Sequence, residues 1–227
     1  GGFQAFADDF AAILSKSGVQ FAYSTPVESI HRSSRGGLVL KSKRGKEEFD
    51  KGLVTISPAQ QAKMTPQLSE DYLKGLLELK SLGAVVMIIS MKHQLSREGY
   101  YWYNLPKSAG FPFLALVEHT NFLPARYFNN EHIIYCGDYL EAGHEYFNMT
   151  QEELVERFMP SFKRINPDFQ PEWINKVWLW KTNYAQPVPL VNHSQNIPAI
   201  ETPIEGLYFA SMSQVYPWDR GTNFAVA

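Results

Sequence analysis

The residues with the clearest potential for chemistry lie near the end of the chain. An aromatic pair, a turn and several residues that commonly begin helices occur together in the stretch YPWDRGTN, residues 216–223. Free amides at the start of a helix stabilise a negative charge or a carbonyl oxygen. The apolar run at 207–210 predicts a buried strand just before this stretch. The sequence therefore predicts a strand, a loop and the first turn of a helix that together bind a ligand.

Glu118 and His119 form a second candidate site, because both directly follow the apolar run at 113–117. Polar side chains at a strand end often face a pocket, although a strand end capped by turn-forming residues gives the same pattern. Nearby tyrosines are spaced so that they either line an aromatic cavity on one sheet face or pack in the core with their hydroxyls at its rim. These tyrosines are Tyr101, Tyr103, Tyr135 and Tyr139.

Lys181 is a third candidate, since it lies among aromatic residues in the stretch WLWKTNY at 178–184. Desolvation at such a position would lower the lysine pKa toward values useful for base chemistry. A side chain that extends to solvent is the alternative.

Other catalytic motifs are missing from the sequence. It contains neither a glycine-rich phosphate loop nor a GxSxG nucleophile turn. The six histidines are scattered and the single cysteine, Cys136, has no CxxC partner, so we predict no metal site. One cysteine also excludes an internal disulfide and fits a reducing, cytoplasmic location.

Composition limits the class of protein. The 227 residues carry a formal net charge of -2 without a strongly basic region, which predicts no nucleic-acid partner. The longest apolar run, residues 82–91, is about half the length that a transmembrane helix needs, and its β-branched residues favour a buried strand. The start of the sequence lacks the features of a signal peptide. We expect a globular protein that acts on a small molecule.

Hydrophobic periodicity predicts alternating helices and strands. Helical spacing of apolar residues occurs at 3–16, and again at 69–80 and 151–165, where Thr150 and Glu153 form a capping box. Short strands are expected elsewhere, at 19–23, 27–31, 38–40, 48–50, 53–56, 82–91, 100–103, 113–117, 133–136 and 207–210, and a further apolar stretch lies at 173–180.

These elements divide into two kinds of segment. The strands at the two ends of the chain suit an α/β layer, whereas the middle suits a separate antiparallel sheet with helices. The predicted fold class is mixed α+β, with an antiparallel-rich sheet inserted between two segments of an α/β domain. We place the α/β domain at 1–62 and 186–227, and the inserted domain at 63–185.

Several short motifs in this order give the whole chain a family resemblance. It resembles the C-terminal portion of the FAD-dependent amine oxidase and protoporphyrinogen oxidase-like superfamily, which also includes relatives of UDP-galactopyranose mutase. The motifs are GGFQAF at 1–6, TPVESI at 25–30, the segment 49–58, YAQP at 184–187 and the closing segment from Gly206.

The resemblance implies FAD as the cofactor. It makes 1–62 and 186–227 a partial FAD-binding domain and 63–185 the substrate-binding domain, and it assigns residues to the cofactor. Val27 would offer its backbone to the adenine end, and Ser57 and Pro58 would lie beside the nucleotide. Near the end of the chain, Trp218 and Asp219 would approach the isoalloxazine, and the amides of Gly221, Thr222 and Asn223 would face its O2/N1 edge.

The sequence departs from the family pattern in two places. Ser211 and Met212 stand where many amine oxidases carry a glycine and an acidic residue that contacts the ribityl or phosphate region. Met87 stands where many carry a lysine bridged by water to flavin N5. These departures point away from classical amine oxidation. The substrate pocket is predicted from Tyr101, Tyr103, Glu118, His119 and Tyr216.

The resemblance also implies a truncated flavoprotein oxidoreductase, since the family's glycine-rich pyrophosphate-binding unit is absent from the sequence. We therefore expect hydride transfer to flavin in the intact protein, weak FAD binding by these 227 residues, an inactive fragment, and self-association through exposed apolar surface. Two alternatives stay open. One is a mutase-like flavoenzyme that binds a nucleotide sugar through Arg126 and Arg220, and the other is a non-catalytic domain that binds a ligand or a protein.

Overall fold

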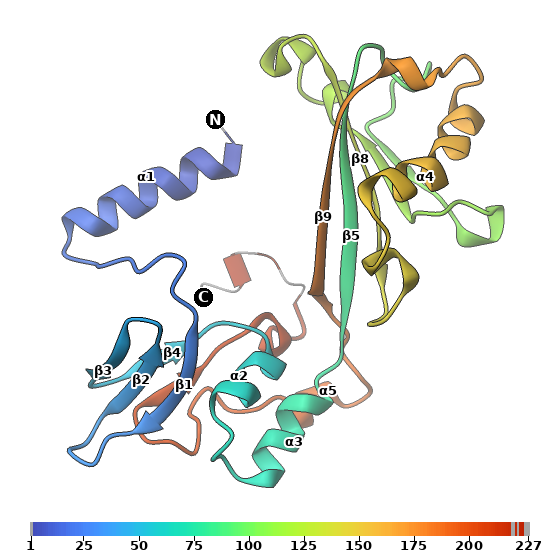
Figure 1. Ribbon diagram of the computed structural model, residues 1–227. Coiled ribbons are helices and arrows are strands. Elements are labelled where there is room, and N and C mark those ends of the chain that lie inside the picture. The colour runs from blue at the N-terminus through green and yellow to red at the C-terminus, as the bar shows by residue number, and fades with distance from the viewer. Residues whose placement is uncertain (1, 219–220, 222, 225–227) are drawn as a thin grey trace. The chain divides into compact units, whose positions relative to one another are not determined.

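A computed structural model describes residues 2–218, 221 and 223–224 of the chain (Figure 1). The chain forms two compact units. The first unit comprises Gly1–Leu77 with Pro198–Ser211, and the second comprises Glu78–Ile197 with Met212–Ala227.

The first unit contains a three-stranded antiparallel meander and a short parallel pair of strands. The meander runs through β1 (Val27–Arg32), β2 (Leu38–Ser42) and β3 (Gly45–Phe49), and the parallel pair joins β4 (Gly52–Val54) to β10 (Leu207–Phe209). Its helices are α1 (Gly2–Lys16), α2 (Pro58–Met64) and α3 (Glu70–Glu78). The side chains that these elements bury together include Ile30, Leu38, Val54, Leu76, Leu207 and Phe209.

The second unit is built on a five-stranded antiparallel sheet of order β6-β7-β8-β5-β9. The strands are β5 (Ser81–Met91), β6 (Trp102–Asn104), β7 (Ala115–Glu118), β8 (His132–Leu140) and β9 (Ile174–Pro187). The long helix α4 (Gln151–Ile165) packs on one face of the sheet (Figure 1). The short helices are α5 (His193–Asn196), η1 (Lys107–Ala109), η2 (His119–Asn121), η3 (Ala125–Phe128), η4 (Glu145–Phe147), η5 (Pro171–Trp173) and η6 (Met212–Gln214).

The core between α4 and the sheet follows from two periodicities. Residues at alternate positions of β5, from Val85 to Met91, face the helix, and Leu154, Phe158 and Phe162 of α4 pack on them at helical spacing. Phe113 adds its ring 4.8 Å from that of Phe158. One sheet face is thereby covered, and the other face remains available for a site.

Most of the predicted elements are present. The helices at 3–16, 69–80 and 151–165 are confirmed, and so is the capping box: the Thr150 hydroxyl accepts from the Glu153 N–H at 3.2 Å, and the Glu153 carboxylate accepts from the Thr150 N–H at 2.7 Å. The predicted mixed α+β class with an antiparallel-rich sheet is also confirmed.

Two local predictions are wrong. Residues 19–23 form no strand, because no neighbouring strand among the described residues pairs with them. Helix α2 was missed, although Ser57 caps it and Pro58 stands at its first position, both common at a helix start.

The domain boundaries stay a prediction. In the structure, the boundaries between the compact units fall after residues 77, 197 and 211. The sequence instead predicts FAD-binding segments at 1–62 and 186–227 around a substrate-binding domain at 63–185. In the part of the chain that the structure describes, no helix has the length and apolar character needed to cross a bilayer.

Candidate functional site

The sheet face opposite α4 carries a continuous set of apolar and aromatic side chains. Directly paired residues of neighbouring strands share a face, so the strand register assigns the members of each row. One row runs across all five strands through Trp102, Val117, Tyr135, Ile88 and Trp178.

A hollow of about 300 Å³ opens on this face. It lies where the next row carries small side chains, because Ala115 pairs with Gly137 and Gly137 pairs with Val86. The rings of Trp102, Tyr135 and Tyr139 also line it. We call this feature the open-face hollow. Small residues between large rings form a mostly apolar depression of a size suited to part of a small molecule.

Tyr103, in contrast, faces the core. It pairs with Leu116, which pairs with the buried Cys136, and its side chain packs against the cluster beneath α4. Tyr103 therefore lies on the opposite sheet face from Tyr135 and Tyr139. Of the two arrangements that the sequence left open, the shared cavity on one face is wrong for Tyr103, which occupies an alternate register position and packs in the core.

Met87 also faces the core beneath α4 and is fully buried between the paired positions of Cys136 and Leu179. Lys181 pairs with Val85, and its ammonium donates to the backbone carbonyls of Phe147, at 3.2 Å, and Met149. Neither side chain lies in the open-face hollow. Lys181 is exposed, as the alternative interpretation expected, and its ammonium also anchors the loop at 147–149.

Glu118 is buried, at 1% exposure, and its carboxylate binds backbone amides. It accepts from the N–H groups of Ser96, at 3.0 Å, and Leu95, at 3.2 Å. Burial, the largest cause, raises the pKa of Glu118, and the hydrogen bonds that the carboxylate accepts oppose the rise. These contacts make Glu118 a support for the loop after β5.

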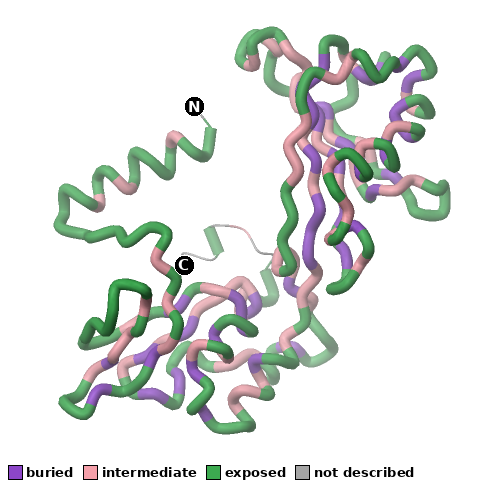
Figure 2. Tube along the Cα trace, in the orientation of Figure 1, coloured by how far each residue is buried: buried purple, intermediate pink, exposed green. Residues whose placement is uncertain are grey.

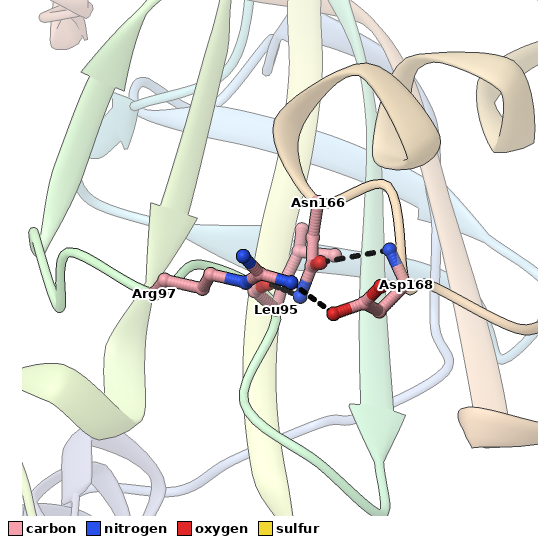
Figure 3. Close-up of polar contacts among 4 residues, drawn as sticks. All are labelled: Leu95, Arg97, Asn166 and Asp168. Atoms are coloured by element: carbon pink, nitrogen blue, oxygen red, sulfur yellow. Dashed lines mark hydrogen bonds and ion pairs between the residues drawn. The ribbon is translucent and has the colours of Figure 1, made fainter.

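A second set of contacts holds the same loop (Figure 3). The Asn166 side chain donates to the Leu95 carbonyl at 2.7 Å and accepts from the Asp168 N–H at 3.0 Å. Arg97 forms an ion pair with Asp168. The loop is thus fixed by both its backbone and its side chains at the end of α4.

His119 and Tyr101 lie beside residues of the open-face hollow. The His119 ring stands edge-on to Tyr135, with 5.6 Å between centroids, and also to Phe128 at 5.3 Å. Tyr101 lies 6.4 Å from Trp102, again between ring centroids. Neither residue lines the hollow itself, but each supports a ring that does.

The first unit contains a separate groove of about 850 Å³. Val27 of β1 and the whole of β4 line it, together with residues of α2 such as Gln60, Lys63 and Met64. Ser57 and Pro58 begin α2 directly after this lining, and the Ser57 hydroxyl accepts from the Gln60 N–H at 3.3 Å. The structure thus brings three predicted cofactor residues to the groove or its edge.

The predicted residues near the chain end are only partly described. Met212 begins η6, Tyr216 packs its ring 5.3 Å from that of His193, and Trp218 stacks on Phe224 at 5.4 Å. Gly221 accepts from the Phe224 N–H at 3.0 Å, and Asn223 is helical and exposed. Asp219 and Thr222 lie outside the described residues.

Comparison with known proteins identifies the family. The model of the flavin containing amine oxidoreductases matches residues 1–217. The chain belongs to this family. No curated protein matches the chain.

Solved structures share the fold of this chain. A putative protoporphyrinogen oxidase from Exiguobacterium sp. 255-15 superposes with a TM-score of 0.72 at 17% identity, over 89% of this chain and 44% of that one. An oxidoreductase from Methanosarcina mazei gives 0.64 at 19% identity, over 90% and 47%.

A reduced UDP-galactopyranose mutase gives a TM-score of 0.60 at 13% identity, over 78% of this chain and 38% of that one. The chain thus spans less than half the length of each of these structures. Identities this low show a shared fold and do not assign a substrate.

Sequence reasoning missed several residues of the open sheet face. Trp178 and Trp180 alternate in β9 and share this face with Trp102. Their period-two spacing was the available signal. Ala115 and Gly137, whose small size forms the hollow, gave no signal, since their importance depends on which strands lie beside them.

Proposed function

We propose that this chain supplies the substrate-binding surface and part of the FAD site of a flavin-dependent oxidoreductase. The observation that carries the proposal is the open-face hollow, an apolar depression with aromatic walls on a sheet whose other face is sealed by α4. An apolar or aromatic part of a substrate would bury its surface there. The family match supplies the redox chemistry.

The groove of the first unit fits one end of the cofactor. Its volume, about 850 Å³, lies in the range of cofactor sites, and its lining is mostly apolar with polar groups from Gln60 and Lys63. Val27, with Ser57 and Pro58 at the edge, would hold the adenine end. We further propose that Trp218, Asp219, Gly221, Thr222 and Asn223 contact the flavin ring, with Ser211 and Met212 near the ribityl chain.

FAD held by these residues would supply the hydride-acceptor chemistry of the reaction. The residues of this chain would orient the substrate and keep water from it. Trp102, Tyr135 and Tyr139 supply rigid walls for that task. His119 would hold the ring of Tyr135 in position, and Tyr101 would hold that of Trp102.

The test begins with the natural full-length product. It should purify with a yellow chromophore, and the chromophore should bleach when the substrate is added without oxygen. A colourless protein that gains no flavin on reconstitution would refute the oxidoreductase proposal and favour a non-catalytic binding domain. The 227 residues alone should bind FAD weakly, which isothermal titration with FAD would measure.

A second candidate function is a non-redox reaction on a nucleotide sugar. The fold likeness to a reduced UDP-galactopyranose mutase favours it, and Arg126 of η3 would have to reach the diphosphate together with Arg220. The apolar lining of the open-face hollow argues for oxidation instead. Saturable binding of UDP-galactose to the full-length product, lost in Arg126→Ala and kept in Lys163→Ala, would reverse this preference.

A further inference from the structure

Ser213 is the meeting point of three separate parts of the second unit. It belongs to η6, directly before the aromatic stretch 216–218, and is 2% exposed. Its hydroxyl lies 2.9 Å from the Tyr184 hydroxyl, which comes from β9. Its carbonyl lies 3.2 Å from Nε2 of His193, which opens α5. The turn at Ser213 thus has two side-chain anchors, the buried His193 and the partly buried Tyr184.

The chemistry of the His193 contact is fixed by its partner. A carbonyl oxygen only accepts hydrogen bonds, so Nε2 of His193 carries the proton that is donated to Ser213. His193 is itself buried, at 5% exposure, and its ring stands edge-on to Tyr216 with 5.3 Å between centroids. The imidazole therefore holds this segment twice, by a hydrogen bond to the backbone and by a ring contact.

Such anchors matter because the end of this segment is exposed. Residues 215–218 belong to no helix or strand, and Tyr216 and Trp218 are 43% and 64% exposed. Loops with few buried contacts open locally at low free energy. Removing one buried anchor should therefore change the mobility of this loop more than it changes the stability of the sheet.

We infer that His193 and Tyr184 are positioning residues that fix the segment Met212–Trp218 for contact with the cofactor. The inference rests on the proposed function, which assigns Trp218 to the flavin ring and Met212 to the ribityl chain. Neither residue touches the reacting atoms. They act through Ser213 and Tyr216, and they determine where Tyr216 and Trp218 are presented.

The first experiment needs no cofactor. Hydrogen exchange of the 227-residue chain is followed by mass spectrometry in His193→Phe, which keeps a ring beside Tyr216 but loses the donor, and in Tyr184→Phe, which loses one hydroxyl. Amides of 212–218 should exchange about five- to tenfold faster in both variants. Peptides of α4 should not change. His193→Gln, which keeps a donor, should restore part of the protection.

Matched controls use exposed residues of the same types. His31→Phe in β1 and Tyr23→Phe, at 74% exposure, should leave the exchange of 212–218 unchanged. If His193→Phe and Tyr184→Phe also leave it unchanged, the two residues are not anchors and the inference is overturned. This result would not depend on whether the protein binds flavin.

The second experiment uses the flavin-loaded full-length product. His193→Phe should shift the flavin absorption bands and the midpoint potential, and His193→Gln should reverse part of the shift, while His31→Phe has no effect. Faster exchange with an unaltered flavin spectrum and potential would show that the segment is anchored but not directed at the flavin, which overturns the positioning role. A wild-type protein that binds no flavin would instead refute the proposed function.

Discussion

At the scale of single residues, Glu118 shows how position in a fold decides a side chain's task. From the sequence it is a polar residue at a strand end, a common place for a pocket residue. In the structure its carboxylate is buried and accepts two backbone amides of the loop after β5. A buried carboxylate needs hydrogen-bond partners of this kind. Because its partners are the amides of Leu95 and Ser96, Glu118 stabilises the loop that carries Tyr100 and Tyr101.

The raised pKa of Glu118 predicts a pH dependence of stability. Because the folded pKa exceeds its ordinary value of 4.5, the native state binds the proton more tightly than the unfolded state. The carboxyl's contribution to the free energy of unfolding therefore falls as pH rises from about 4.5 through the folded pKa. The Glu118→Gln variant has an amide in place of the carboxyl, so this pH-dependent contribution is absent from it.

The stability difference, Glu118→Gln minus wild type, should accordingly increase over that pH range, measured by urea unfolding at several pH values. Glu172→Gln, at an exposed position of η5, serves as the control and should give a difference that does not vary in this way. A constant difference for Glu118→Gln above about pH 4.5 would contradict the assigned burial effect.

Ala115 allows a direct test of the open-face hollow. Ala115→Leu should fill the space beside Gly137 and weaken the binding of a small aromatic probe, indole, about tenfold, through loss of buried contact. Shifts of the Gly137 and Val86 amide resonances during an indole titration measure this. Ala142→Leu, an exposed substitution in a loop, should bind indole as the wild type does. Equal affinity in both variants would show that indole does not use the hollow.

At the scale of elements, α4 is the helix that makes the sheet one-sided. Its apolar stripe covers the face that carries Met87, which leaves the Trp102 row uncovered. The helix begins at a capping box between Thr150 and Glu153. The hydrogen bonds of the capping box stabilise the first turn of α4 and so help the helix to pack on the sheet.

Thr150→Ala should lower the free energy of unfolding by about 1 kcal/mol, because the Glu153 N–H loses its acceptor at the helix start. Thermal and urea unfolding of the chain both report this change. Ser108→Ala, an exposed hydroxyl in η1, should have an effect close to zero. Unchanged midpoints in Thr150→Ala would mean that the cap contributes nothing to stability.

At the scale of the whole molecule, helix α1 stands out because none of its residues is buried (Figure 2). Phe3, Phe6, Phe10 and Ile13 repeat at helical spacing and are 92%, 66%, 52% and 60% exposed. A contiguous apolar stripe of this kind promotes association. The amphipathic pattern of α1 therefore contributes no buried side chain to the core of the first unit.

The double variant Phe6→Ser/Phe10→Ser should reduce self-association of the chain, measured as the concentration dependence of the sedimentation coefficient. Its unfolding free energy should change by less than about 0.5 kcal/mol per site, as for other surface positions. Phe113→Ser, at a fully buried position, should instead cost about 3–5 kcal/mol. Undiminished association in the double variant would show that α1 is not the contact surface.

The sequence by itself determined the elements whose information is local. Apolar spacing and capping residues predicted α1, α3 and α4, and alternation predicted most strands, because such patterns depend only on neighbours along the chain. The family resemblance likewise rested on short motifs in a fixed order, and the match over residues 1–217 agrees with it.

Only the tertiary structure decided which face each strand residue occupies. Tyr103 and Tyr135 seem equivalent in sequence, yet the register directs one into the core and the other toward the open-face hollow. A shift of one position reverses every side chain of a strand, and the register is fixed by partners distant in sequence. The burial of Glu118 and the convergence of Tyr184 and His193 on Ser213 arise in the same way, from contacts across the fold.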